Sequence, residues 1–166
     1  MTTMYSGFGP HLMLDCRQCD PERIGSLQFV FDFLYRLPER IGMTRIIQPY
    51  VFPYEGLIPE DKGITGLVVI AESHITFHSF TEKDYFFFDI FSCKPFDVDK
   101  TQALVLEAFG VRDFEAHHAS RGRLFPRTVE ERACLVAPPA AATEALAPTR
   151  EREAAPLLEH AGARRA

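Results

Sequence analysis

The sequence predicts an α+β fold, a two-layer α/β sandwich in which helices cover one face of a mainly antiparallel sheet. Three observations predict this architecture. Short runs rich in β-branched and aromatic residues recur between His11 and His118, and two longer runs carry apolar residues at helical spacing. The elements follow one another in the order β-α-β-β-β-α-β, and successive strands without a helix between them pair as antiparallel neighbours.

Each predicted strand combines β propensity with turn-forming residues at its ends. The stretch 44–52 is β-rich, and the stretch 53–63 behind it is a loop rich in Pro, Gly and acidic residues. The five strands of the predicted order are expected at residues 11–16, 66–71, 74–80, 85–92 and 111–118.

Two helices carry recognisable start and stop signals. The first begins with Asp20 as its N-cap and Pro21 at its first position, and it ends near Pro38. Its apolar residues recur at helical spacing, namely Ile24, Leu27, Phe31 and Leu34. Asp97 caps the second helix, which runs to Gly110, a residue suited to ending a helix.

The composition predicts one folded domain and a tail. A chain of 166 residues with 46% hydrophobic and 12% aromatic residues can bury one sizeable core. From residue 137 onward Ala and Pro dominate and no aromatic residue occurs. We therefore expect a domain over residues 1–136 and a disordered Ala/Pro-rich tail over residues 137–166.

Charge and hydropathy exclude several classes of partner. The net charge is -5, from 18 basic and 23 acidic residues, and there is no Lys/Arg-rich run that would bind nucleic acid or an anionic membrane. No apolar run approaches the ~20 residues of a membrane-spanning helix, and the first residues do not form a signal peptide. A cytoplasmic protein is expected.

The sequence predicts no metal site. Cys16 and Cys19 form one C-x-x-C pair, but a second pair with zinc-finger spacing is absent, so reduced thiols are the simpler interpretation. His74 and His78 are four residues apart, which suits metal ligands on a helix, but the β-prone residues between them favour a strand.

Polar residues interrupt the apolar run 67–71 where Glu72, Ser73 and His74 follow it. Desolvating polar groups in a buried strand costs free energy, so a function is expected here. A serine hydrolase is excluded because the G-x-S-x-G signature is missing. Taken singly, Ser73 could be a hydroxyl at a strand edge, His78 a hydrogen-bonded histidine and Cys93 a buried thiol.

Taken together, residues 72–93 read E-S-H-I-T-F-H-S-F-T-E-K-D-Y-F-F-F-D-I-F-S-C. This stretch resembles the processing site and active centre of the prokaryotic S-adenosylmethionine decarboxylases. The resemblance extends more loosely from His11 to about Phe125 and excludes the tail. The fold that it implies, an α/β sandwich that usually forms a homodimer, agrees with the predicted order of strands and helices.

The resemblance implies that the chain is a zymogen that cuts itself between Glu72 and Ser73. The Ser73 hydroxyl attacks the Glu72 carbonyl, an ester forms, and elimination and hydrolysis leave a covalent pyruvoyl group derived from Ser73. His78 is the implied processing base, and the Thr65 hydroxyl assists. The products, residues 1–72 and 73–166, are expected to stay associated.

The resemblance also implies the reaction. The pyruvoyl group forms a Schiff base with the α-amine of S-adenosylmethionine and takes up the electron pair left when carbon dioxide departs. Cys93 then protonates the substrate carbon. Phe52 and Phe80 are implied to stack on the adenine, and Glu82 to bind the ribose. The product is the aminopropyl donor for spermidine and polyamine biosynthesis.

Two alternatives stay open. Family members commonly read H-T-W-P-E where this chain has residues 78–82, H-S-F-T-E, and Lys94 replaces the usual glycine after the cysteine. The pocket could therefore be tuned to ornithine or arginine, which the same pyruvoyl chemistry would decarboxylate. A non-catalytic homologue that serves as a binding or regulatory subunit is the other alternative.

The assignment of His78 meets one geometric difficulty. Side chains alternate between the two faces of a strand, so Ser73 and His78, five positions apart, point to opposite faces of an ideal strand. A bend, a bulge or a rearrangement on cleavage would be needed to bring them together.

Overall fold

The computed structural model describes residues 7–136, with side chains as far as Arg132. The chain divides into two compact units between Phe125 and Pro126. The first unit carries every sequence-predicted strand and helix, and it is described first.

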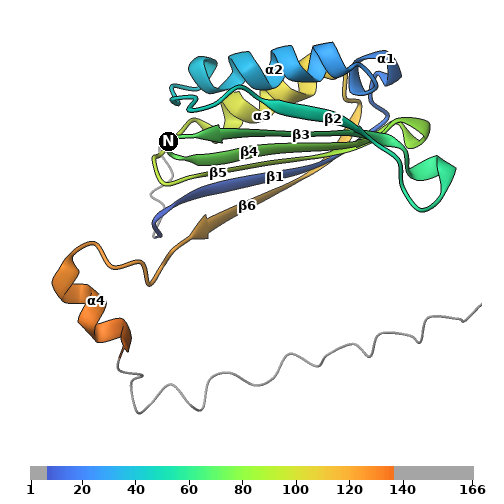
Figure 1. The fold of residues 1–166 in the computed structure, drawn as a ribbon. Helices are drawn as coiled ribbons and strands as arrows, with labels where there is room; N and C mark the ends of the chain where they lie inside the picture. The colour runs from blue at the N-terminus through green and yellow to red at the C-terminus, as the bar shows by residue number, and fades with distance from the viewer. Residues whose placement is uncertain (1–6, 137–166) are drawn as a thin grey trace, which may run out of the picture. The chain divides into compact units, whose positions relative to one another are not determined.

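One six-stranded sheet forms the centre of the first unit (Figure 1). Its order is β2-β3-β4-β5-β1-β6, and neighbouring strands all pair antiparallel. The strands are β1 (Gly9–Arg17), β2 (Tyr50–Tyr54), β3 (Gly63–Ile70), β4 (Ser73–Phe80), β5 (Tyr85–Ser92) and β6 (Asp113–Arg121).

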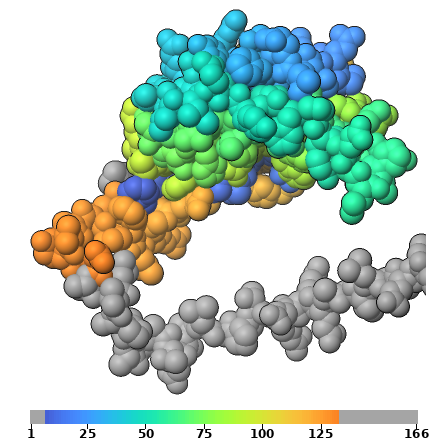
Figure 2. All heavy atoms as spheres, in the orientation of Figure 1, coloured from blue at the N-terminus to red at the C-terminus, as the bar shows by residue number. Residues whose placement is uncertain are grey.

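Helices of this unit lie on one face of the sheet (Figure 1). They are α1 (Pro21–Ile24), α2 (Leu27–Arg40) and α3 (Val98–Ala108), and short 3₁₀ turns occur at η1 (Pro59–Asp61) and η2 (Thr81–Lys83). Helix α2 packs over β2 and β3, which Figure 2 shows as helix atoms in contact with the edge strand, and α3 packs over β1. The predicted α+β two-layer sandwich is therefore confirmed.

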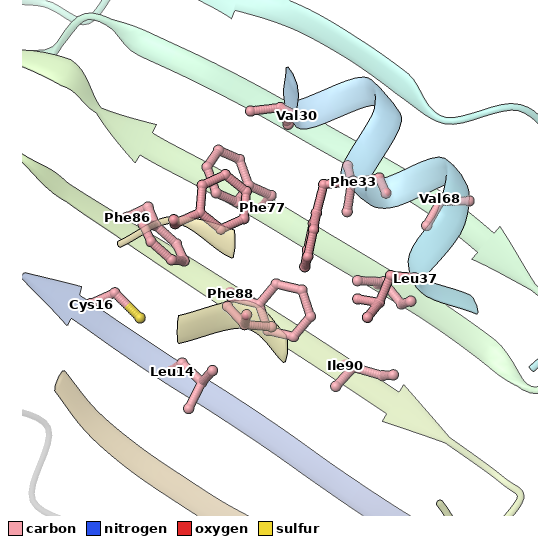
Figure 3. Packing of buried hydrophobic residues seen from close by; sticks show 14 of the residues in the cluster. Leu14, Cys16, Val30, Phe33, Leu37, Val68, Phe77, Phe86, Phe88 and Ile90 are labelled. Atoms are coloured by element: carbon pink, nitrogen blue, oxygen red, sulfur yellow. The ribbon is translucent and has the colours of Figure 1, made fainter. Parts of the chain in front are cut away.

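The core fills the space between the helices and the sheet (Figure 3). Strand residues alternate as expected, since Ile75 and Phe77 of β4 are buried under the helices whereas His74 and His78 lie on the other face. A cluster of phenylalanines from both layers occupies the middle. The ring of Phe109, which follows α3, lies 4.9 to 5.0 Å from three other rings, those of Phe33, Phe77 and Phe86.

The first predicted helix is two helices. Asp20 caps α1 as expected, accepting hydrogen bonds from the backbone N–H groups of Glu22 and Arg23. The helix then ends at Gly25, and the Ser26 hydroxyl accepts a hydrogen bond from the Phe29 N–H at the start of α2. This break shifts the helical phase, so the predicted core residue Leu27 is 44% exposed.

The buried stripe of α2 consequently differs from the predicted one. It consists of Val30, Phe33, Leu34, Leu37 and Pro38. The helix also continues past Pro38, where it was expected to end, as far as Arg40.

The β-rich stretch 44–52 is a strand only in its last part. β2 begins at Tyr50, directly after Pro49, and extends to Tyr54 in the expected loop, while Arg45 makes an isolated bridge to Ile70. The final strand is shifted toward the C-terminus, because β6 starts at Asp113 and ends at Arg121.

The described part of the second unit contains α4 (Val129–Val136), which the sequence patterns did not predict. The Thr128 hydroxyl accepts from the Glu131 N–H at its start, in the manner of an N-cap. The predicted tail over residues 137–166 lies outside the described residues.

The phenylalanine cluster should dominate the stability of the first unit. Phe109 is fully buried, so Phe109→Ala should lower the free energy of unfolding by about 3–5 kcal/mol. Phe114→Ala is the matched control, because Phe114 is 39% exposed and its truncation should cost less than about 1 kcal/mol. Urea unfolding followed by circular dichroism measures both, and equal losses would contradict this account of the core.

Candidate active site

The candidate residues gather on the face of the sheet that α1, α2 and α3 leave free, called here the uncovered face. Cross-strand partners in an antiparallel sheet share a face, and one such row runs Phe52, Thr65, His78 and Phe87 across β2, β3, β4 and β5. The uncovered face also exposes large apolar and aromatic side chains in this region: Tyr50, Phe52, Tyr54, Leu67 and Phe87.

Glu72 and Ser73 lie at the tight hairpin between β3 and β4. Ala71 and Glu72 form the turn, and Ile70 pairs with Ser73 across it. The backbone of Ser73 has φ = 154°, a conformation that is disfavoured for residues other than glycine. Such a residue stores about 1–3 kcal/mol of strain, which the surrounding hydrogen bonds must offset.

The Glu72 residue is held from two sides. Its carbonyl oxygen accepts a hydrogen bond from the backbone N–H of Cys93 at 2.9 Å. Its side-chain carboxylate accepts from the backbone N–H of Thr44 at 3.1 Å, and the Ala71 N–H donates to the Thr44 carbonyl at 2.8 Å. The carbonyl that precedes Ser73 is therefore fixed and polarised by a donor already in position.

Cys93 follows β5 directly and is a half-buried free thiol. The close approach of β1 to this segment requires Gly9, because a Cβ on that residue would come within 1.8 Å of the Ser92 carbonyl oxygen. Lys94 donates from its Nζ to the Gly42 carbonyl at 2.8 Å. Lys94 thus ties the Cys93 segment to the chain preceding Thr44.

Ser73 contacts His74 in this structure. The Ser73 Oγ lies 2.9 Å from the His74 Nδ1. The His74 Nε2 lies 3.6 Å from one carboxylate oxygen of Asp89, and the His11 Nε2 lies 2.7 Å from the other. Strands β1, β4 and β5 therefore bring a hydroxyl, two imidazoles and a carboxylate into one cluster.

His78 is held by a different set of residues. The Thr65 Oγ1 lies 2.7 Å from its Nδ1, and the rings of Tyr54 and Phe80 lie 5.2 and 4.8 Å from its ring. Burial lowers the pKa of His78 below its ordinary value of 6.5, so the neutral form of the ring predominates at pH 7. A neutral imidazole can accept a proton.

Ser73 and His78 are not brought together within one chain. They lie five positions apart on the regular strand β4, which corresponds to roughly 16 Å at about 3.3 Å per residue. The bend or bulge that their direct contact would require is absent from β4.

The predicted substrate-binding residues lie near His78. Phe52 precedes Thr65 in the cross-strand row, and Phe80 packs edge-on against the His78 ring. Glu82 lies in η2 and forms an ion pair with Lys62 at 2.8 Å. Phe52 and Phe80 therefore offer aromatic surface on the uncovered face, while Glu82 is paired at the end of β4.

Neither cysteine of the C-x-x-C pair belongs to the cluster around Ser73. Cys16 and Cys19 are both buried, and burial raises the pKa of Cys19 to about 12 and that of Cys16 further. Across residues 7–136 we find no group of His, Cys, Asp and Glu that could hold a metal ion.

No helix of the described chain is long and apolar enough to cross a membrane.

Concavity alone does not identify the site. A hollow of about 560 Å³ is lined by Cys19, Arg23, Lys83 and neighbouring residues, and a smaller one of about 240 Å³ by Tyr54, Lys62 and their neighbours. Ser73 and Cys93 line neither of them.

The S-adenosylmethionine decarboxylase family model matches residues 10–122, more than half of the chain. The chain belongs to this family.

Individual relatives agree. An S-adenosylmethionine decarboxylase proenzyme of Clostridium botulinum is 31% identical over 121 residues, which cover 72% of this chain and 97% of the relative. A proenzyme of Pyrococcus abyssi with the same name is 28% identical over 115 residues, covering 69% and 78%. The crystal structure of the adenosylmethionine decarboxylase of Aquifex aeolicus has the same fold, with a TM-score of 0.60 and 19% identity over 70% of this chain and 92% of that one.

Sequence reasoning gave no role to three residues of the Ser73 cluster. His74 was considered only as a metal ligand, and His11 and Asp89 only as parts of strands. One signal could have found them: a carboxylate stands alone in the Phe-rich run 86–91, at a position that faces the same way as the alternating histidines.

Proposed function

We propose that this chain is a self-processing, pyruvoyl-dependent decarboxylase that acts on S-adenosylmethionine and supplies the aminopropyl donor for spermidine synthesis. One observation carries the proposal: the Cys93 N–H donates to the Glu72 carbonyl, the group that Ser73 must attack. Family membership and the proenzyme relatives support the same activity.

Self-cleavage follows from groups of the chain itself. The Ser73 Oγ adds to the Glu72 carbonyl carbon, and the electron pair displaced onto the carbonyl oxygen is stabilised by the Cys93 N–H, as in an oxyanion hole. The Glu72–Ser73 C–N bond then breaks to leave an ester and a free amine. Removal of the Ser73 α-proton expels Glu72 as a carboxylate, and hydrolysis of the resulting dehydroalanine releases ammonia. The strained φ of Ser73 is relieved once this bond is cut.

The residues present fit a pyruvoyl group at position 73. A serine follows a carbonyl that already accepts a backbone donor, and a thiol stands at the same hairpin. Such a group supplies an electron sink for the pair left when carbon dioxide departs. Cys93 holds the proton that is delivered to the substrate carbon.

The two products should stay associated because their strands interleave. In the sheet order β2-β3-β4-β5-β1-β6, residues 1–72 supply β1, β2 and β3, and residues 73–166 supply β4, β5 and β6. Strand β1 lies between β5 and β6, so separating the products would break three of the five strand pairs: β3 with β4, β5 with β1, and β1 with β6. We assign the decarboxylase domain to residues 1–136 and the tail to residues 137–166; the family match ends within this domain.

We further propose that the enzyme is a homodimer whose uncovered faces meet. This face exposes five large apolar or aromatic side chains in the region of β2, β3 and β5, and such patches mark association surfaces. Because an isologous dimer places equivalent surfaces in reciprocal contact, Thr65 and His78 of one protomer can approach Ser73 of its partner. The separation of Ser73 and His78 along β4 then presents no obstacle.

The aromatic surface around His78 favours S-adenosylmethionine over ornithine or arginine. Phe52 and Phe80 can stack on an adenine and attract a sulfonium cation through their ring faces. A distal ammonium or guanidinium would instead need a free carboxylate, and Glu82 is neutralised by Lys62. Opening of that ion pair would let Glu82 accept hydrogen bonds from the ribose.

Intact-mass analysis of the purified protein tests the central proposal. We expect two chains, one ending at Glu72 and one beginning with a pyruvoyl group at position 73, and Ser73→Ala should stay uncut because it has no attacking hydroxyl. A wild-type chain that keeps its full-length mass after prolonged incubation would rule out the enzyme and favour a binding or regulatory subunit.

Complementation tests the contribution of His78 across the dimer. Ser73→Ala and His78→Ala should each stay uncut alone, but a co-expressed mixture should yield cut His78→Ala chains, because the Ser73→Ala partner supplies an intact His78. Differently tagged chains and mass spectrometry identify which chain is cut. Cleavage of His78→Ala alone, or none in the mixture, would contradict the shared site.

Cys93→Ala should separate self-cleavage from turnover. The backbone N–H at position 93 is retained, so the chain should still be cut, whereas decarboxylation should fall by about 10²- to 10⁴-fold when the proton donor is lost. Any residual activity should divert to transamination, which converts the pyruvoyl group to alanine and is visible by mass. A variant that is not cut would show that the thiol acts in processing.

Carbon dioxide release from S-adenosylmethionine, ornithine and arginine, compared as kcat/KM, tests the substrate. The highest value is expected for S-adenosylmethionine, and Phe80→Leu should raise its KM by removing the aromatic face. A higher kcat/KM for ornithine or arginine would overturn the substrate assignment but leave the roles of Ser73 and Cys93 intact.

A further inference from the structure

We propose that His74 is a catalytic residue of self-cleavage that accepts the proton of the Ser73 hydroxyl, and that Asp89 and His11 position it. The inference deepens the proposed function and rests on it. The two histidines then act in different steps: His74 is the base in ester formation, and His78 is the base that later removes the Ser73 α-proton.

Contact with the nucleophile is the first support. The His74 Nδ1 lies 2.9 Å from the Ser73 Oγ, within hydrogen-bonding distance. Adjacent side chains of a regular strand point to opposite faces, so this contact depends on the unusual backbone of Ser73. The φ of 154° turns the hydroxyl toward the imidazole. The strained backbone of Ser73 therefore supports proton transfer to His74.

The Asp89 carboxylate supplies the second support, since its charge favours one tautomer of His74. Its two oxygens face the Nε2 atoms of His74, at 3.6 Å, and His11, at 2.7 Å. A carboxylate favours an N–H directed at it, so the His74 proton belongs on Nε2 and the lone pair of Nδ1 faces the Ser73 hydroxyl. Shortening of the 3.6 Å contact as the ring gains charge would stabilise the imidazolium.

Packing fixes both imidazoles around this carboxylate. Phe91 of β5 pairs with His74 on one neighbouring strand and with His11 on the other. Its ring centroid lies 6.2 Å from that of His74 and 5.7 Å from that of His11, and the Arg121 guanidinium lies 4.2 Å from it. The aromatic ring between the two histidines limits their rotation, so Asp89 meets each in one orientation.

The proposed step conserves atoms and electrons. The Ser73 proton passes to the His74 Nδ1 as the Oγ–C bond to Glu72 forms, and the carbonyl electron pair moves to the oxygen held by the Cys93 N–H. When the C–N bond breaks, the same proton passes from His74 to the departing Ser73 nitrogen. The product is an ester with a free amine, and His74 returns to its neutral form.

Hydroxylamine distinguishes the two steps because it splits an ester readily and leaves an amide intact. Wild-type, His74→Ala, His74→Asn, Asp89→Asn and His78→Ala chains are made by cell-free synthesis, and fragments are followed over time with and without hydroxylamine. The asparagine variant keeps a hydrogen-bond acceptor near the position of Nδ1 but cannot take up a proton. His117→Ala is the matched control, since His117 is an exposed histidine of β6 whose contact is Glu115.

We expect His74→Ala and His74→Asn to form ester about 10²- to 10⁴-fold more slowly, so that both resist hydroxylamine. Asp89→Asn should be slowed about 10- to 100-fold, as for partners that orient a catalytic histidine. His78→Ala should accumulate a hydroxylamine-sensitive ester, and His117→Ala should behave as wild type. Added imidazole should restore cleavage of His74→Ala, a rescue that a purely structural role would not allow.

Several results would overturn the inference. They are cleavage of His74→Asn at the wild-type rate, a hydroxylamine-sensitive ester in His74→Ala, or a failure of imidazole to rescue a His74→Ala chain that melts at the wild-type temperature. A wild-type chain that is never cut and resists hydroxylamine would instead refute the proposed self-cleavage itself, so the two failures are distinguishable.

Discussion

The candidate site depends on the antiparallel pairing of β4 with β5. The pairing of Ser73 with Ser92 brings the Cys93 N–H to the Glu72 carbonyl oxygen. In the same register Asp89 pairs with Thr76, two residues along β4 from His74. A shift of one residue would move every side chain of β4 to the other face, so that Ile75 and Phe77 would leave the core. The burial of those two side chains therefore also fixes the geometry of the chemistry.

The two faces of the sheet have different tasks, and the sequence of β4 reflects both. Ile75, Phe77 and Ser79 face the helices, and the Ser79 hydroxyl is satisfied by the Ile64 N–H and the Ile24 carbonyl. His74 and His78 alternate with them on the uncovered face. The polar residues that interrupt an apolar run are thus compatible with a well-packed core, because alternation sends the histidines away from it.

Local signals predicted local features well. Asp20 and Asp97 were recognised as caps because capping needs only a side chain and the next few N–H groups. The roles of Ser73, His78 and Cys93 came from a motif and stay predictions. The break between α1 and α2 was missed although Ser26 could have revealed it as an N-cap. The contact of Asp89 with His74 and His11 could not be predicted, because it depends on the register among three strands that are distant in sequence.

The interleaved sheet has a consequence for how the protein is made. Strand β1 must enter between β5 and β6 while the chain is still continuous, because in an uncut chain that insertion is a unimolecular event. After the cut, recovery from unfolding requires two separate polypeptides to meet, and it becomes dependent on their concentration. The hydrogen bond from the Cys93 N–H to the Glu72 carbonyl depends on the register of the folded sheet, so the proposed self-cleavage requires folding to be completed first. Maturation is then a one-way process: the mature protein can be denatured, but it cannot return along the route by which it first folded.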